Sequence, residues 1–271
     1  MSLRSDCEGI VPDSLLPLVP LRYDIVGDIA ILSLPDPLIA FSDRIALAVT
    51  FRRKNIRTIL RKVTKIEGER RVARFEVLTG RSTETIHHES GYLYRLDVTK
   101  AFFAPRLASE RKRVTSQVGS GESVLVPFAG VGPFSIPAAV KGGYVTAIEN
   151  NLAAFRFLDE NVDLNGMADR TCLIFGDAFN TILFSGKKYD RAIIPAPYGQ
   201  DRILDLIIPV IKKMGMIHMY TFRTTTEIPA LITEYCQKGL HVNSFRQCGN
   251  TAPGVSRWVF DLCNEALSGV P

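Results

Sequence analysis

Apolar and polar residues are patterned in two different ways along this chain of 271 residues, and the change falls near residue 95. Before it, short apolar runs end at Gly, Pro or charged residues, which is typical of strands. Residues 38–50 instead carry the three-to-four-residue spacing of a helix. The predicted strands cover residues 28–34, 56–63, 75–78 and 92–96. Residues 1–94 therefore predict a small α+β domain.

After about residue 120, predicted strands and helices alternate. The strands cover 123–126, 144–148, 172–175, 191–194 and 215–222, the helices 133–140, 152–165, 203–213 and 228–238, and two more strands lie near 240–247 and 256–263. Strands that alternate with helices predict a mostly parallel, doubly wound sheet covered on both faces. We therefore predict an α/β, Rossmann-like domain over residues 95–271.

Positive charge is concentrated in residues 51–74, although the net charge of the chain is only +5. That segment holds ten basic residues against Glu67 and Glu69, a balance of +8, so the remainder carries about −3. Such a concentration suits a polyanion such as nucleic acid. An ordinary solvated face explains the charge equally well, so the pattern alone leaves both interpretations open.

Several protein classes do not fit the composition. The chain has no run of 18 apolar residues, and its charged N-terminus lacks a signal-peptide core, so we expect a cytoplasmic protein without membrane contact. Its five cysteines are scattered, which argues against a disulfide scaffold and a zinc site. The densest metal-like cluster is His87-His88-Glu89, but adjacent strand residues face opposite ways, so we expect no metal. His218 is expected to be a sheet residue with satisfied hydrogen bonds, and Trp258 a core residue.

Two glycines follow the first strand of the second domain, in the segment from Phe128 to Phe134 (FAGVGPF). Glycine adopts positive φ and lets the backbone approach a ligand closely. The helix that follows offers unpaired amide donors at its N-terminus. In a doubly wound sheet, nucleotides bind at the carboxyl ends of the strands, where this turn is expected.

Acidic residues end the next two strands. Glu149 comes 19 residues after Gly130, the spacing of a carboxylate that binds both hydroxyls of a ribose. Asp177, after the third strand, is placed to accept from an adenine amino group, with a helix cap as the alternative. The predicted cofactor contacts are Phe128, Ala129, Gly130, Val131, Gly132, Glu149, Asn150, Asp177 and Ala178.

The turn lacks two features of the nicotinamide fingerprint G-x-G-x-x-G. Ser135, rather than glycine, stands three residues beyond Gly132, and Pro133 stands where a pyrophosphate would need a free helix amide. Both features favour an adenosine ligand without a pyrophosphate. We therefore expect S-adenosyl-L-methionine.

The segment Phe128–Ile136 (FAGVGPFSI) resembles the first motif of the tRNA guanine-37 N1-methyltransferases of archaea and eukaryotes. The wybutosine-synthesis transferases belong to the same superfamily of class I S-adenosylmethionine-dependent enzymes. The resemblance extends over nearly the whole chain, through the segments 27–32, 68–78, 85–91, 97–100 and 103–111. The last of these reads F-x-P-R-L-x-x-E-R, which resembles the methyltransferases rather than the aminocarboxypropyl enzymes of the superfamily.

The resemblance implies a reaction in which N1 of a guanine loses its proton and receives a methyl group. Glu110 occupies the position of the proposed base, Arg71 that of the proposed O6 donor, and Tyr198 an aromatic that stacks on a flipped base. A helix-surface pairing of Glu110 with Arg113 or Arg106 is the alternative. The implied partner is the tRNA anticodon stem-loop, and the residues expected to bind it are Arg52, Arg53, Lys54, Arg57, Lys62 and Arg106. The sequence implies no protein partner and leaves the oligomeric state open.

The chain departs from the family pattern at two positions. Val126 replaces an aspartate near the methionine part of the cofactor, and Pro195, expected to contact the cofactor, replaces the asparagine of the loop after the fourth strand. Pro195 has no side-chain donor to fix the target base. Three functions therefore stay open: a tRNA guanine N1-methyltransferase, a wybutosine-pathway transferase of a methyl or aminocarboxypropyl group, and a tRNA-binding relative without catalysis.

Overall fold

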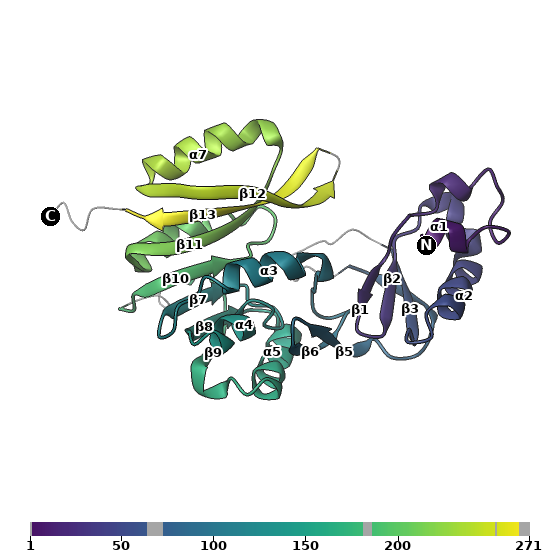
Figure 1. Cartoon of the computed structure of the whole chain (residues 1–271), viewed down its shortest axis with the longest axis horizontal. Helices are drawn as coiled ribbons and strands as arrows, with labels where there is room; N and C mark the ends of the chain where they lie inside the picture. Colours follow the sequence, from purple (N-terminus) through teal and green to yellow (C-terminus); the bar gives the residue numbers. More distant parts are fainter. Residues whose placement is uncertain (1, 64–72, 181–185, 253, 266–271) are drawn as a thin grey trace. The chain divides into compact units, whose positions relative to one another are not determined.

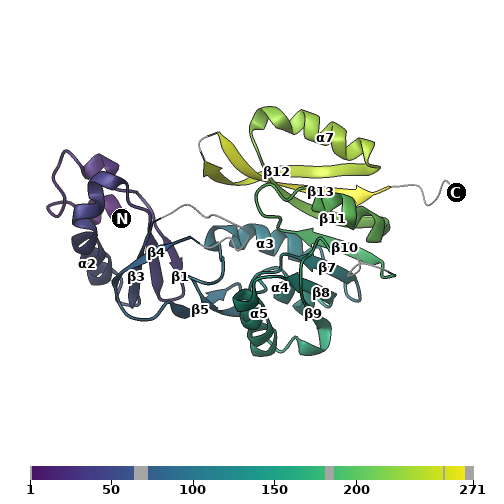
Figure 2. The same ribbon diagram turned by 180° about the vertical axis from the view of Figure 1, so that it is seen from behind.

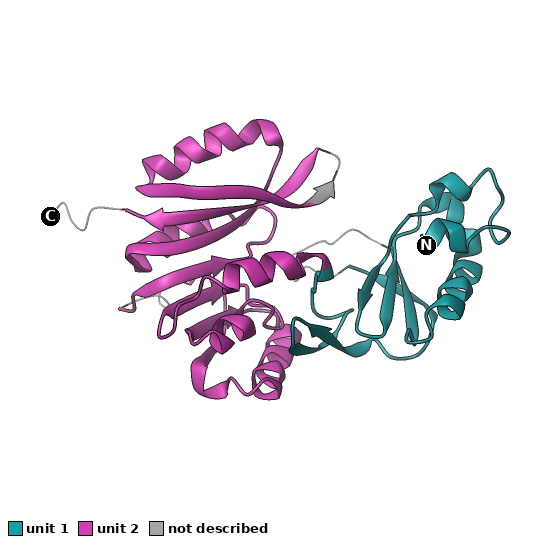
Figure 3. Cartoon of the chain, in the orientation of Figure 1, with its two compact units in different colours: residues 1–105 teal, residues 106–271 magenta. Residues whose placement is uncertain are grey.

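The computed structural model describes residues 2–63, 73–180, 186–252 and 254–265, and the chain forms two compact units. Unit 1 comprises residues 1–105 and unit 2 residues 106–271 (Figure 3). The predicted boundary falls earlier, after residue 94. The hairpin and the segment after it belong to unit 1, because Phe103 contacts the rings of His87 and Tyr94 at centroid distances of 4.9 and 5.5 Å.

Unit 1 is built around a four-stranded sheet in the order β1-β2-β3-β4 (Figure 1). Its elements are α1 (Leu3–Asp6), β1 (Asp24–Val26), β2 (Ile29–Leu32), α2 (Ser42–Arg52), β3 (Thr58–Lys62), β4 (Phe75–Thr79), β5 (Glu84–Glu89) and β6 (Tyr92–Asp97). β2 and β3 are parallel, the other pairs are antiparallel, and β5 and β6 form a separate hairpin. Ile45 and Val49 of α2 share a buried core with Leu32 and Ile59 of the sheet. The predicted α+β character of this half is therefore present.

Unit 2 contains a seven-stranded sheet in the order β12-β13-β11-β10-β7-β8-β9 (Figure 1). Its elements are α3 (Ala108–Thr115), β7 (Ser123–Pro127), α4 (Ser135–Val140), β8 (Tyr144–Glu149), α5 (Leu152–Leu164), β9 (Thr171–Phe175), β10 (Tyr189–Ile194), α6 (Ile203–Ile207), β11 (Ile211–Arg223), α7 (Ile228–Gln237), β12 (Leu240–Ala252) and β13 (Val255–Asn264). Neighbours from β9 to β11 are parallel, and β13 is antiparallel to both β11 and β12. The sheet is the predicted doubly wound, mostly parallel one.

Side-chain parity separates the two faces of this sheet. Ile217 and Met219 of β11 share a core with Ile203 of α6 and Leu231 of α7, so these helices cover one face. Tyr220 is one residue after Met219, so its side chain points to the opposite face of the sheet, where its hydroxyl reaches Glu110 of α3. Figure 2 shows the ribbon, with α3 labelled, from behind. The chain order reverses between β7 and β10, the point at which such sheets bind ligands.

One predicted helix is shorter than expected. The pattern predicts a helix over 203–213, whereas α6 ends at Ile207 and β11 begins at Ile211. Residues 208–210 form a single 3₁₀ turn that contains Pro209. Proline has no amide hydrogen to continue the helical ladder, which explains the early end.

Candidate active site

The turn between β7 and α4 carries the two glycines at the carboxyl edge of the sheet. Phe128 and Gly130 have φ angles of 55° and 58°, and Gly132 has a φ of 96°. A Cβ atom at Gly132 would lie 2.9 Å from terminal carbons of Ile136 and Leu158, so a larger residue would have to displace these side chains as well as adopt a strained backbone angle. Positive φ is rare at a residue such as Phe128, and backbone strain of this kind concentrates at functional sites.

Glu149, at the end of β8, closes this turn. Its Oε2 accepts a hydrogen bond from the Gly130 amide at 2.7 Å, and its Oε1 accepts one from the Asn151 amide at 2.8 Å. The residue is only 8% exposed, whereas the neighbouring Asn150 is exposed. A carboxylate can accept more than one hydrogen bond at each of its oxygens. Glu149 thus orders the turn and presents there the type of group that binds the hydroxyls of a ribose.

The loop after β9 approaches the same edge. Asp177 is exposed, and its Oδ1 accepts from the Phe179 amide at 3.0 Å in a local turn. The Phe179 ring lies 6.0 Å from that of Phe128, and the guanidinium of Arg202 lies 4.8 Å from its centroid. Ala178 is buried beneath them. Sequence reasoning did not single out Phe179, whose contact with Phe128 joins the two loops.

The loop after β10 begins with the proline that replaces the family asparagine. Pro195 is half-buried, and the amide of Ala196 donates to the carbonyl of Ile194 at 2.8 Å in a tight turn. Tyr198 is 71% exposed, and its ring lies 5.8 Å from that of Phe222 at the end of β11. This loop therefore offers an open aromatic ring but no amide side chain at position 195.

Glu110, the predicted base, is buried in α3 and held by two donors. Arg113 donates to it from Nη2 at 2.7 Å and from Nε at 3.0 Å, and the Tyr220 hydroxyl donates to Oε1 at 3.1 Å. Burial and the neighbouring Glu110 raise the pKa of Tyr220 well above its usual value, so the phenol keeps the proton that it donates. The Tyr220 ring lies 5.4 Å from Phe134, the residue that follows the glycine turn and Pro133. The alternative pairing with Arg113 is thus present, and the role of Glu110 as base stays a prediction.

Behind Glu110, buried charged groups connect α3 to three strands. Arg113 Nη1 donates to Asp261 Oδ2 at 2.6 Å, and His218 Nδ1 lies 2.6 Å from Asp261 Oδ1. On the other side of the ring, Arg191 Nη1 lies 2.8 Å from His218 Nε2. Because a guanidinium can only donate, Nε2 must accept and the imidazole is neutral. The lowered pKa of His218, caused by burial, agrees with this geometry.

The expected roles of His218 and Trp258 are confirmed, since the two residues are 0% and 8% exposed and both ring nitrogens of His218 have hydrogen-bond partners. The charged neighbours of His218 were not predicted. They come from residues far apart in sequence, and only the strand register, which pairs His218 with Asp261, brings them together.

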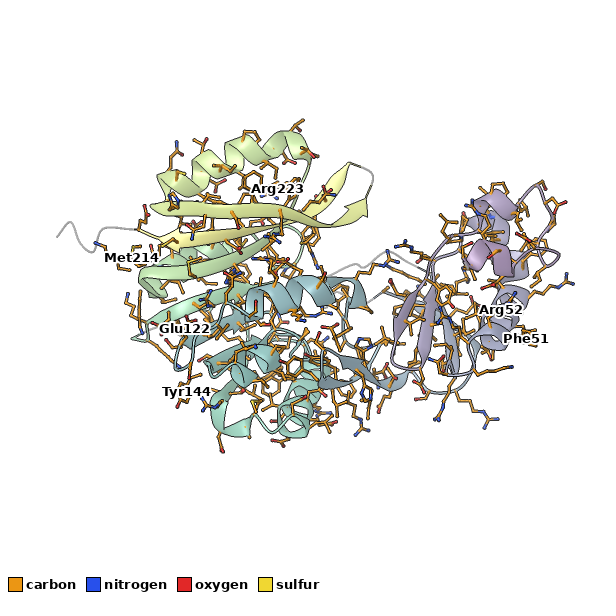
Figure 4. The ribbon with its side chains drawn as sticks, viewed as in Figure 1. Phe51, Arg52, Glu122, Tyr144, Met214 and Arg223 are labelled. Carbon is orange, nitrogen blue, oxygen red and sulfur yellow. The ribbon has the colours of Figure 1, made fainter. Side chains whose placement is uncertain are left out.

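The residues expected to bind tRNA lie mostly in unit 1. Arg52 and Phe51 end helix α2 (Figure 4), with Lys54 Nζ 4.8 Å from the centroid of the Phe51 ring. Of the predicted set, Arg52, Arg53, Lys54, Arg57 and Arg106 are exposed. Lys62 is half-buried in β3, and burial lowers its pKa. Arg71 lies outside the described residues.

The sequence predicted neither a metal site nor a membrane-spanning segment. Among residues 2–63, 73–180, 186–252 and 254–265, no group of three or more His, Cys, Asp and Glu side chains is arranged to hold a metal ion. In the same described ranges, no helix combines the length and apolarity needed to span a membrane.

Family models match both halves of the chain. Residues 85–242 match the TRM5/TYW2 methyltransferase domain, and residues 3–83 match the TYW2 N-terminal domain. The chain is 39% identical over 213 residues to tRNA (guanine(37)-N(1))-methyltransferase Trm5b of Pyrococcus abyssi, which covers 78% of this chain and 63% of that protein. It is 33% identical over 208 residues to tRNA 4-demethylwyosine(37)-methyltransferase Taw21 of Saccharolobus solfataricus, covering 74% of this chain and 77% of that protein. The chain thus spans less than two thirds of the Trm5b relative.

Solved structures agree with this assignment. The complex of aTrm5 and tRNALeu superposes with a TM-score of 0.86 at 28% identity, over 97% of this chain and 78% of that chain. Methanocaldococcus jannaschii Trm5 in complex with adenosine gives a TM-score of 0.83 at 28% identity, over 98% and 79%. The methyltransferase-domain match alone covers more than half of the sequence. This chain therefore belongs to the TRM5/TYW2 family of methyltransferases.

Proposed function

We propose that this chain transfers a methyl group from S-adenosylmethionine to N1 of the guanine at position 37 of tRNA. The observation that carries the proposal is the glycine turn closed by Glu149, which is linked to the buried Glu110 because Phe134, just after the turn, contacts the ring of Tyr220, the donor to Glu110. The identity to Trm5b and the tRNA-bound structural relative support the same reaction. A cytoplasmic location stays a prediction.

The residues of the sheet edge fit the adenosine part of the cofactor. The backbone of Gly130 and Gly132 leaves room for its close approach, Glu149 would accept from the ribose hydroxyls, and Asp177 from the adenine amino group. The relative that binds adenosine supports this assignment. When bound, S-adenosylmethionine supplies an electrophilic methyl group.

The protein's own groups would handle the proton and the base. N1 of guanine carries a proton at neutral pH, and Glu110 would remove it as methylation proceeds. Arg113 and Tyr220 keep that carboxylate fixed, so little reorganisation is needed when the base arrives. Arg71 would donate to O6, and Tyr198 would stack on the flipped base.

Residues 1–94 would serve as a small tRNA-binding domain for the anticodon stem-loop. Its exposed basic residues near the end of α2 would contact phosphates, which position an RNA without reading its sequence. Binding should then weaken steeply with salt, with a log–log slope of roughly −0.7 to −0.9 per phosphate contact. An affinity for tRNA that does not change with salt would contradict this role.

The test is methylation of a tRNA transcript, followed by mass analysis of its nucleosides. The transcript with guanine at position 37 should yield a guanosine heavier by one methyl group, and the transcript with adenine there should yield none. Glu110→Gln should lower the rate of the chemical step by about 10²- to 10⁴-fold, the usual contribution of a general base. Glu234→Gln, an exposed change on α7, is the matched control. A Glu110→Gln enzyme with the wild-type rate would exclude that residue as the base.

One observation favours a second candidate, a wybutosine-pathway transferase. The N-terminal match is to the TYW2 N-terminal domain, and the chain spans 77% of Taw21. Under this alternative, the substrate is tRNA that carries 4-demethylwyosine, and the product gains either one methyl or one aminocarboxypropyl group. The same mass analysis separates the two. A protein that binds tRNA but not S-adenosylmethionine would instead be the non-catalytic relative.

A further inference from the structure

Arg257, near the start of β13, is a half-buried cation that the proposed reaction does not yet use. Its guanidinium carbon lies 4.7 Å from the centroid of the Phe222 ring. Its Nε is buried and has no hydrogen-bond partner within the described parts of the chain. Most buried polar groups in proteins have a partner, so this donor needs an explanation.

The groups that affect the pKa of Arg257 do not neutralise its positive charge. The groups that interact with it electrostatically are the thiol of Cys248, the phenol of Tyr220 and the guanidinium of Arg111. A thiol and a phenol are neutral near pH 7, and Arg111 is a like charge. Burial accordingly lowers the pKa of Arg257. An arginine in such surroundings retains its capacity to bind an acceptor that arrives from outside.

The position of Arg257 is fixed by strand register. It pairs directly with Phe222 of β11, so both side chains lie on the same face of the sheet. Tyr220, two residues before Phe222, lies on that face too and reaches Glu110. Phe222 and the neighbouring Arg223, labelled in Figure 4, stand at the carboxyl end of β11. Arg257 is therefore at the edge and on the face where the proposed base lies.

Two aromatic rings next to Arg257 favour a flat ligand over a hydrated phosphate. Phe222 contacts both the guanidinium and the ring of Tyr198, which is largely exposed. A nucleobase stacked on Tyr198 would bring its edge toward the donors of Arg257. The guanidinium is planar, and its contact with the Phe222 face fixes the plane in which those donors point.

We propose that Arg257 donates to the acceptor edge of the target guanine, O6 and N7, and so supplies from β13 the donor that Pro195 lacks. The proposal rests on the proposed function, and it assigns base specificity to a residue of unit 2. Guanine presents two acceptors on this edge, whereas adenine presents an amino donor in place of O6. Arg257 would therefore accept guanine and reject adenine.

The test compares binding of two tRNA transcripts, with guanine or adenine at position 37, in the presence of S-adenosylhomocysteine. Wild-type protein should prefer guanine by roughly 10- to 100-fold, the discrimination typical of one bidentate arginine. Arg257→Met keeps an unbranched apolar chain but has no donor, and it should bind both transcripts with the weak affinity of the adenine form. Arg257→Lys should also lose the preference, because an ammonium cannot make the bidentate contact. Arg246→Met, an exposed change on β12, should keep the full preference.

Thermal melting of each variant establishes that it is folded before binding is measured. Equal weakening of both transcripts by Arg257→Met, with recovery by Arg257→Lys, would assign the residue to a phosphate and overturn the proposal. Weaker binding of S-adenosylhomocysteine without RNA would assign it to the cofactor, with the same consequence. An unchanged preference in Arg257→Met would show that Arg257 does not read the base. If the wild-type protein itself shows no preference, the proposed function fails and this inference fails with it.

Discussion

Glu149→Gln is the change that most directly tests the predicted adenosine site. The carboxylate lies between two backbone donors, the amides of Gly130 at 2.7 Å and Asn151 at 2.8 Å. Glutamine has the same shape but only one acceptor oxygen. Whichever way the new amide is oriented, its NH₂ group faces one backbone N–H, so one of the two hydrogen bonds is lost.

The structure sets the size of two separate effects. Loss of a hydrogen bond to a charged group in a buried position costs about 1.5–3 kcal/mol, so the free energy of unfolding should fall by about that amount. The proposed ribose contact also uses this carboxylate, and loss of one charge-assisted hydrogen bond to a hydroxyl is of the same size. Since about 1.4 kcal/mol corresponds to a factor of ten, the affinity for S-adenosylmethionine should fall roughly 10- to 100-fold.

The two effects are measured independently. Isothermal titration with S-adenosylmethionine gives the affinity of the folded protein, and urea denaturation without ligand gives the free energy of unfolding. Asp159→Asn, which neutralises an exposed acid on α5, should change neither quantity by a measurable amount.

The loss of stability and the loss of affinity can each be absent without the other, and each of these results has its own interpretation. Reduced stability with unchanged affinity would refute the ribose contact and leave Glu149 as a residue that only closes the turn. Unchanged stability would contradict the importance of the two backbone hydrogen bonds.

Three further predictions concern the stability of unit 2, all measured by urea denaturation. Arg113→Met should lower the free energy of unfolding by about 3–5 kcal/mol, because it leaves two buried carboxylates without their shared cation, whereas the exposed neighbour Lys112→Met should have little effect. Burial lowers the pKa of His218, so below pH 6.5, its ordinary pKa, the unfolded chain binds a proton that the folded chain resists. The contribution of His218 to stability should therefore be complete above that pH and decrease as the pH falls, and His218→Gln should flatten this slope. Gly132→Ala should lower the free energy of unfolding by about 1–3 kcal/mol more than Gly166→Ala does. Both positions have positive φ, but only an added Cβ at Gly132 meets neighbouring atoms, so equal losses of stability would refute the steric argument.

The layered fold of unit 2 could be predicted because its signals are local. Strands and helices alternate, and the spacing of apolar residues within each segment is enough to identify it as a strand or a helix. The strand order is not a local property. β13 lies between β11 and β12 and runs antiparallel to both, and no periodicity within residues 255–264 distinguishes that position from an edge. The three residues of β1 are too few to show a period at all.

The candidate site also combines features with local sequence signals and contacts that depend on strand order. The glycine turn and the acid after the second strand lie 19 residues apart in one strand-turn-helix-strand unit, so their spacing alone indicated that both belong to one site. The hydrogen bond between Gly130 and Glu149 was not predicted. Arg113 lies three residues from Glu110, so the sequence alone offered this pairing. Tyr220 and Asp261 come from positions more than 100 residues away, and they reach Glu110 or Arg113 only through sheet register. The sequence could therefore propose Glu110 and its local partner, but not the contacts that come from the strands.

What holds Glu110 determines how the site can work. Arg113 and Tyr220 both belong to unit 2, and Arg113 is itself fixed by Asp261, which is fixed in turn by His218. The position of the proposed base therefore depends on α3, β11 and β13. Arg257 lies on the same face as Tyr220 and contacts Phe222, its direct partner on β11. If both groups act on the guanine, deprotonation and a part of its recognition are set by one sheet edge of unit 2, and the exposed basic residues near the end of α2 serve to bind the RNA. Changes in the exposed residues near the end of α2 should then alter tRNA affinity while leaving the preference for guanine intact.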